Sequence, residues 1–121
     1  MQDVADMMSM LFASRDQAHM FHLQTGSYAM HKALDTYYNE IIAFVDDYVE
    51  MFQGRYGLIK GYMPASKYFE GDDQVIPYFT GLALYVDGNR SKLPIDTDLN
   101  NVMDEISGLI RSTIYKLTFL K

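Results

Sequence analysis

The sequence predicts an all-α protein, a four-helix bundle that forms a single domain over residues 1–121. Three observations support this fold class. Apolar residues recur at the helical period of about 3.6 residues in three long segments. Glycine and proline gather in the breaks between segments. The chain of 121 residues is long enough for one hydrophobic core and too short for two domains.

The first predicted helix spans residues 3–24. The residues on its inward stripe, at helical spacing, are Val4, Met8, Leu11, Arg15, Ala18 and His22, with Phe12 and His19 beside them. The tripeptide Thr25-Gly26-Ser27 then interrupts the pattern, since glycine often ends a helix and serine often caps the next one. We therefore expect the chain to reverse direction here.

The second predicted helix spans residues 28–53. Its buried stripe consists of Leu34, Tyr38, Ile41, Val45, Tyr48 and Phe52. Gly54 and Gly57 are expected to end this helix. Residues 54–72, which contain four glycines and Pro64, are predicted to form a long connection.

The third predicted helix is short and covers residues 75–86. This apolar run has no clear period, so a strand is the alternative, but Pro77 suits the first turn of a helix better than the middle of a sheet. Asp87-Gly88-Asn89 is expected to end it. The fourth helix is predicted at 97–119, with Leu99, Val102, Ile106, Leu109, Thr113 and Leu117 facing inward. One long crossover between two helix pairs is the wiring of ferritin-like bundles.

Composition excludes several classes of function. The net charge is −6, from 16 acidic and 10 basic residues, which argues against nucleic-acid binding. The absence of cysteine excludes a disulfide scaffold and a thiolate metal site. We expect no signal peptide and no membrane span, because the start lacks a basic segment and no apolar run is long enough. We therefore expect a cytoplasmic protein.

Four potential metal ligands lie on the second helix: His31, Asp35, Asp46 and Glu50. They share an arc of roughly 100° around the axis, and each i,i+4 pair lies on one side. The two pairs are about 16 Å apart along the axis, so no single ion reaches both. Two antiparallel copies of the helix would bring the His31 end of one subunit to the Glu50 end of another, and a two-fold dimer would contain two such sites.

His19 extends this ligand set. If the chain reverses near Gly26, His19 and His31 are about equally far from the turn and should lie at one level. Imidazoles with carboxylates suit Fe(II) or Zn(II) better than Mg or Ca. His22 is a further candidate ligand, with a satisfied core histidine as the alternative. For the carboxylates, the alternative is a solvated helix face.

The stretch from Gln17 through His31-Lys-Ala-Leu-Asp35 to Asp46-Asp-Tyr-Val-Glu50 resembles the ferroxidase signature of Dps-type miniferritins. The intervals that match run from a first histidine to a second twelve residues on, an Asp four later, and an Asp and a Glu eleven and fifteen after that. The matching residues are His19, His31, Asp35, Asp46 and Glu50. The tract also resembles small uncharacterised proteins of tailed phages, which would place the protein in a host cytoplasm.

The resemblance to the miniferritins implies a four-helix bundle, a twelve-subunit shell, and a di-iron site shared across a two-fold interface. It also implies Fe(II) oxidation, usually by peroxide, with mineral storage; Zn could substitute for Fe(II). The sequence departs from the family at Met20, where an aromatic residue is expected, and lacks the lysine-rich DNA-binding tail.

Two hypotheses of function therefore follow from the sequence. The first is an iron-binding, ferroxidase-type homo-oligomer built on two-fold dimers, with His19, His31, Asp35, Asp46 and Glu50 as catalytic metal ligands. The second is a non-enzymatic phage bundle that acts in self-assembly or in binding a host protein.

Overall fold

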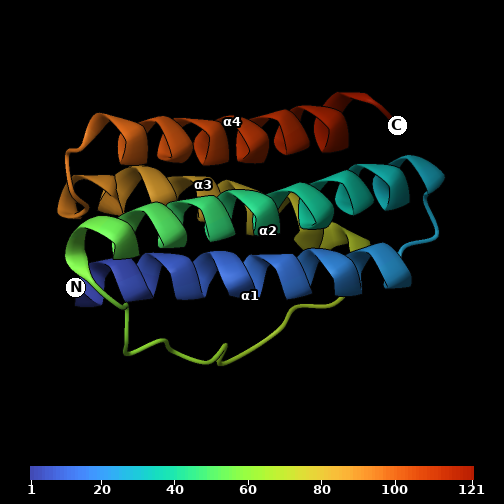
Figure 1. The fold of residues 1–121 in the computed structure, drawn as a ribbon. Coiled ribbons are helices and arrows are strands. Elements are labelled where there is room, and N and C mark those ends of the chain that lie inside the picture. Colours follow the sequence, from blue (N-terminus) through green and yellow to red (C-terminus); the bar gives the residue numbers. More distant parts are fainter.

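The computed structural model describes residues 1–121 and contains helices and no strands (Figure 1). The main helices are α1 (Gln2–Gln24), α2 (Tyr28–Tyr56), α3 (Val75–Asn89) and α4 (Thr97–Phe119). Two single-turn 3-10 helices, η1 (Asp72–Gln74) and η2 (Arg90–Lys92), flank α3. The predicted all-α four-helix bundle is thus confirmed, and residues 75–86 are helical throughout.

Residues 57–71 form the long crossover, which runs from the end of α2 along the outside of α1 to the start of α3 (Figure 1). Because it returns the chain to the opposite end of the bundle, α3 runs in the same direction as α2. α1 packs mainly on α2, α2 also on α4, α4 on α3, and α3 only lightly on α1. Each of these contacting pairs is antiparallel.

The inward faces of the four helices form one apolar core. Nearly all of the stripe residues predicted from the sequence are buried. Arg15, Tyr38 and Val102 are half-buried instead, because they lie at the edges of their stripes. None of the helices combines the length and the apolar character needed to cross a membrane.

Two helices extend beyond their predicted bounds of 28–53 and 75–86. α2 continues through Gly54 and ends at Gly57, whose φ of +92° lies in the left-handed region that glycine tolerates. α3 continues through Asp87-Gly88-Asn89, and the chain leaves helical geometry only at Leu93, in extended backbone before Pro94.

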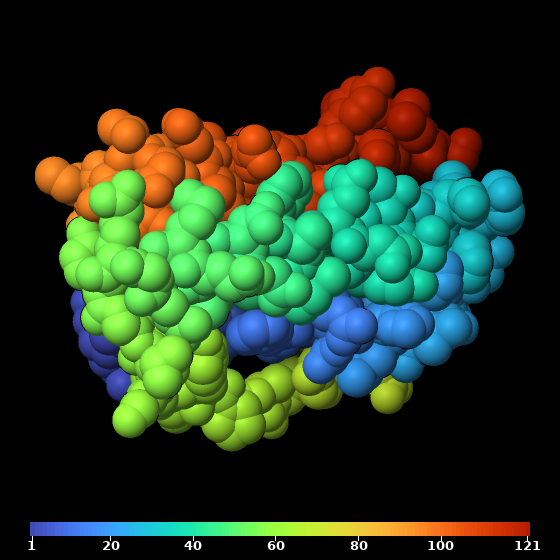
Figure 2. Space-filling view, in the orientation of Figure 1, coloured from blue at the N-terminus to red at the C-terminus, as the bar shows by residue number.

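Polar side chains of α1 hold the crossover in place. The amide of Gln17, which is 1% exposed, donates to the Phe69 carbonyl at 3.0 Å and accepts from the Phe69 N–H at 2.7 Å. The Ser9 hydroxyl accepts a hydrogen bond from the Met63 N–H at 2.9 Å. These bonds pair backbone groups that have no helical partner. Figure 2 shows the crossover as a ridge beneath α1, with an opening between the two.

Candidate functional site

The outer side of the α1–α2 pair, close to the turn that joins them, carries a group of polar rings and one carboxylate. We call it the histidine cluster, and its members are His19, His22, His31, Asp35 and Tyr38. At the far end of the same face, Asp46 and Glu50 form what we call the acidic end.

The rings of His22 and His31 stack at a centroid distance of 3.7 Å with 17° between their planes. The Nδ1 of His22 bonds to the His31 carbonyl at 2.7 Å, and the Nδ1 of His31 bonds to the His22 carbonyl at 2.9 Å. A carbonyl only accepts, so both Nδ1 atoms carry the proton. In the neutral rings, Nε2 therefore keeps its lone pair. This tautomer is the one that a metal-binding histidine adopts.

His19 lies against Tyr38 rather than at the level of His31. The His19 and Tyr38 rings stack at 4.2 Å with 9° between their planes, and the His19 ring is 5.9 Å from that of His22. The reversal of the chain is centred between Gly26 and the next residue, so His22, not His19, is as far from it as His31. The expectation that His19 and His31 pair across the turn is therefore replaced by a His22–His31 pair.

Asp35 is held by its own helix. It accepts hydrogen bonds from the Tyr38 hydroxyl at 2.8 Å and from the Asn39 amide at 3.3 Å. The Tyr38 hydrogen bond lowers the pKa of Asp35, and the positive charge of Lys32, about one turn earlier on α2, contributes less. The same bond raises the pKa of Tyr38. Asp35 is thus an ionised carboxylate at neutral pH, already oriented toward the cluster.

Asp46 and Glu50 differ from Asp35 in their surroundings. Both side chains are exposed, and neither forms a hydrogen bond or an ion pair within the chain. Ideal helix geometry places them about 16 Å along α2 from the His31–Asp35 pair.

No three histidine or acidic side chains of one chain lie close enough to hold a metal ion. The structure brings His31 and Asp35 onto one end of the face, with His19 beside them, and leaves Asp46 and Glu50 apart. The imidazoles and carboxylates fit Fe(II) or Zn(II) in chemistry. They fit only in part, because a complete site needs ligands from outside the chain.

Sequence reasoning missed two contributors to this region. Tyr38, predicted as core packing, links His19 to Asp35; the i,i+3 spacing from Asp35 is the signal that could have identified it. Arg15 lies one turn before His19, and its Nε is buried without a hydrogen-bond partner. Its positive charge lies close enough to lower the pKa of Tyr38 in part. The same guanidinium forms an ion pair with Asp16 at 3.1 Å, so its charge is already balanced within the chain.

The chain matches a family of unknown function, DUF5856, over residues 22–117. The protein belongs to this family. The matched range contains His22, His31, Asp35 and the acidic end, whereas His19 precedes it. No curated protein and no solved structure matches the chain.

Proposed function

We propose that the protein is a ferritin-like homo-oligomer, related to the Dps-type miniferritins, that binds Fe(II) and oxidises it at sites shared between two copies. The observation that carries this proposal is the reciprocal pairing of His22 and His31. Both Nδ1 atoms are occupied by carbonyls, so both Nε2 atoms keep lone pairs, and the ionised Asp35 follows His31 by about one turn of α2. His22 thereby joins His19, His31 and Asp35 as a candidate ligand.

A second copy would supply the missing ligands. Asp46 and Glu50 have no partner within the chain, so both remain free to meet a neighbouring subunit. An antiparallel, two-fold arrangement would bring the imidazoles and Asp35 of one copy opposite the free carboxylates of the other. Such dimers could assemble into a larger shell.

Iron is the substrate in this proposal. Carboxylate oxygens are hard donors that stabilise Fe(III), and imidazoles hold Fe(II) without adding charge. Two Fe(II) ions each give one electron to hydrogen peroxide, which takes up two protons and leaves as two waters; O2 is the alternative oxidant. Zn(II) would occupy the same ligands without redox chemistry. The reaction suits the cytoplasm, or a host cytoplasm if the protein is phage-encoded.

The test begins with the purified protein and Fe(II) in the absence of air, with bound metal and solution mass measured together. Peroxide is then added and the absorbance of Fe(III) is followed. Asp46→Ala or Glu50→Ala should abolish oxidation and leave helicity unchanged. Asp47→Ala is the matched control, because Asp47 is exposed on the same helix about 100° around the axis from Asp46. Unchanged oxidation in both test variants would refute the proposal.

The second candidate is a non-enzymatic bundle that uses the α1–α2 face to associate with itself or with a host protein. The observation that favours it is that no three potential ligands converge within one chain. A protein that forms dimers yet takes up no iron would support this candidate over the first.

A further inference from the structure

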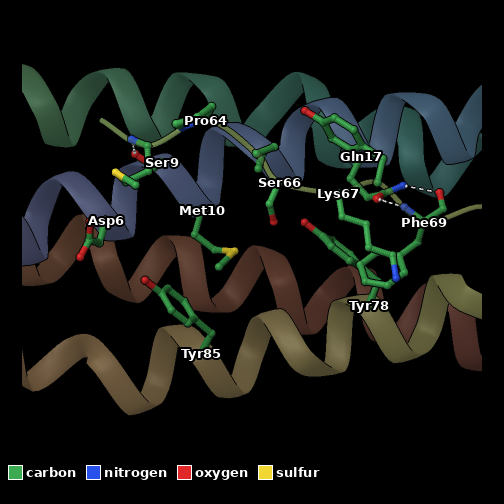
Figure 3. Close-up of a pocket in the computed structure, with 14 residues that line it drawn as sticks. Asp6, Ser9, Met10, Gln17, Pro64, Ser66, Lys67, Phe69, Tyr78 and Tyr85 are labelled. Carbon is green, nitrogen blue, oxygen red and sulfur yellow. Dashed lines mark hydrogen bonds between the residues drawn. The ribbon is translucent and has the colours of Figure 1, made fainter. Parts of the chain in front are cut away.

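A cavity of about 430 Å³ lies between α1, the crossover and α3. The α1 residues that line it include Met10 and Gln17 (Figure 3). Helical geometry places these residues on a different side of α1 from His19 and His22. The opening between α1 and the crossover in Figure 2 is on the same side of α1 as this cavity. The cavity is therefore separate from the proposed iron site.

The space exists because α1 and α3 contact each other only lightly, and the crossover covers the seam between them. Small side chains face the gap, including Ala13 from α1 and Ser66 from the crossover. The hydrogen bonds of Ser9 and Gln17 to the crossover hold this cover at a fixed distance from α1. Because these bonds lie within the chain, the cavity is formed before any ligand arrives.

The lining combines aromatic rings with unpaired hydroxyl groups. The Tyr78 and Phe69 rings lie 6.0 Å apart at one end, and the Met10 thioether and the Tyr85 ring line the middle. The hydroxyls of Ser66 and Tyr78 point into the space and bond to no other residue (Figure 3). Burial raises the pKa of Tyr78, so its hydroxyl remains protonated and available as a donor.

The cavity is also lined by one acidic and one basic side chain, which bear on the charge of a ligand. Asp6 and Lys67 line opposite ends of the cavity (Figure 3). The Lys67 ammonium lies 5.1 Å from the centre of the Phe69 ring, a cation–π contact. Because the two ends carry opposite charges, the cavity as a whole favours neither a cation nor an anion, and a neutral ligand leaves both side chains hydrated at its rim.

We propose that this cavity binds a neutral, planar aromatic molecule of one or two rings that carries a single hydrogen-bonding group. The volume exceeds the roughly 150 Å³ of a cavity that holds benzene, and it falls within the range of about 300–1,000 Å³ for ligand sites. Rings and thioethers would contact the ligand faces, and the Tyr78 and Ser66 hydroxyls would pair with its polar group.

The experiment uses the full chain and two probes of the same shape, 2-naphthol and naphthalene, followed by the amide NMR signals of the protein. Both probes should shift the signals of residues 63–69 and of the α3 turn around Tyr78. Tyr78→Phe should weaken 2-naphthol about five- to tenfold, the effect of one lost hydrogen bond, and leave naphthalene affinity unchanged.

A cavity-filling variant provides the second arm. Ala13→Phe should abolish binding of both probes, whereas Ala43→Phe, at an exposed position of α2, should bind them as the parent protein does. If circular dichroism shows that Ala13→Phe does not fold, the two-probe comparison in Tyr78→Phe decides alone. No saturable shift with either probe, or equal weakening of both by Tyr78→Phe, would overturn the proposal. Neither arm depends on iron binding.

Discussion

At the turn end of α2, His31 and Asp35 are held by neighbouring side chains and carbonyls, whereas at the far end Asp46 and Glu50 extend into solvent without a partner. The four residues share one arc of one helix. In the proposed site, the chain itself preorganises one half, and a second copy would order the other half. A site shared between subunits is expected to combine ligands held within one chain with ligands that have no partner in their own chain.

A buried tyrosine lies beneath each end of α2, and the two again differ. The Tyr37 hydroxyl is hydrogen-bonded to the Ser14 hydroxyl at 2.7 Å, and the Tyr37 ring packs edge-on against Phe79. The Tyr48 hydroxyl is buried with no hydrogen-bond partner. The two buried tyrosine hydroxyls of α2 therefore differ in hydrogen bonding, since that of Tyr37 has a partner and that of Tyr48 has none.

The largest effect should come from breaking the histidine pair. His22→Ala or His31→Ala removes one hydrogen bond and a ring stack, since the backbone carbonyl at the changed position still accepts from the other imidazole. Each should lower the free energy of unfolding by about 1–3 kcal/mol. Asp46→Ala should change it by less than about 0.5 kcal/mol. Urea denaturation of the three variants measures the contrast. Equal losses at both ends would show that the histidine pair contributes no stability of its own.

The buried tyrosines give a second, matched contrast. Tyr37→Phe removes the partner of a buried hydroxyl and should destabilise the protein by about 1–2 kcal/mol. Tyr48→Phe removes a buried hydroxyl that has no partner, so stability should stay the same or rise by up to about 1 kcal/mol. The same denaturation measurement tests both. A loss in Tyr48→Phe as large as that in Tyr37→Phe would mean that the Tyr48 hydroxyl is satisfied after all.

At alkaline pH, the buried Tyr48 should make stability depend on pH, whereas a solvent-exposed tyrosine such as Tyr115 should not. Burial raises the pKa of Tyr48 to about 12, while the unfolded value is about 10. The folded pKa is the higher one, so deprotonation favours the unfolded chain. The contribution of the neutral Tyr48 to stability is therefore fully present below pH 10 and is lost as pH rises toward 12. From pH 9 to 11, the parent protein should lose about 1.4 kcal/mol more than Tyr48→Phe. Tyr115→Phe, at an exposed position, should behave as the parent does; identical losses in Tyr48→Phe would contradict the assignment.

The helices were predictable because burial follows a local period. The start of α2 at Tyr28 and both ends of α4 agree with the sequence prediction. The end of α2 was not predictable, since Gly54 and Gly57 look alike in sequence and only the second adopts a positive φ. Which of the two glycines ends the helix depends on where the crossover begins, and the local sequence pattern does not carry that information.

For the candidate site, the sequence predicts which residues share a helix face, but not which side chains of the two helices contact each other. Helical spacing places His31 and Asp35 on one side of α2, as the structure does. Which residue of α1 meets His31 depends on the centre of the turn, and a shift of about one residue exchanges His19 for His22. The attachment of the crossover to Gln17 joins positions 52 residues apart, and only the assembled fold shows it.

The smallest expected effect concerns the pKa of the Asp35 carboxylate at the turn end of α2. Asp35 has a lowered pKa, chiefly because of the Tyr38 hydrogen bond, so its contribution to stability is present above the unfolded pKa and is lost as pH falls through the folded value. Tyr38→Phe should raise the pKa of Asp35, measured from its side-chain carbonyl carbon by NMR, whereas Thr36→Ala, at a neighbouring position without a contact to Asp35, should not. An unchanged titration would show that the hydrogen bond does not form in solution.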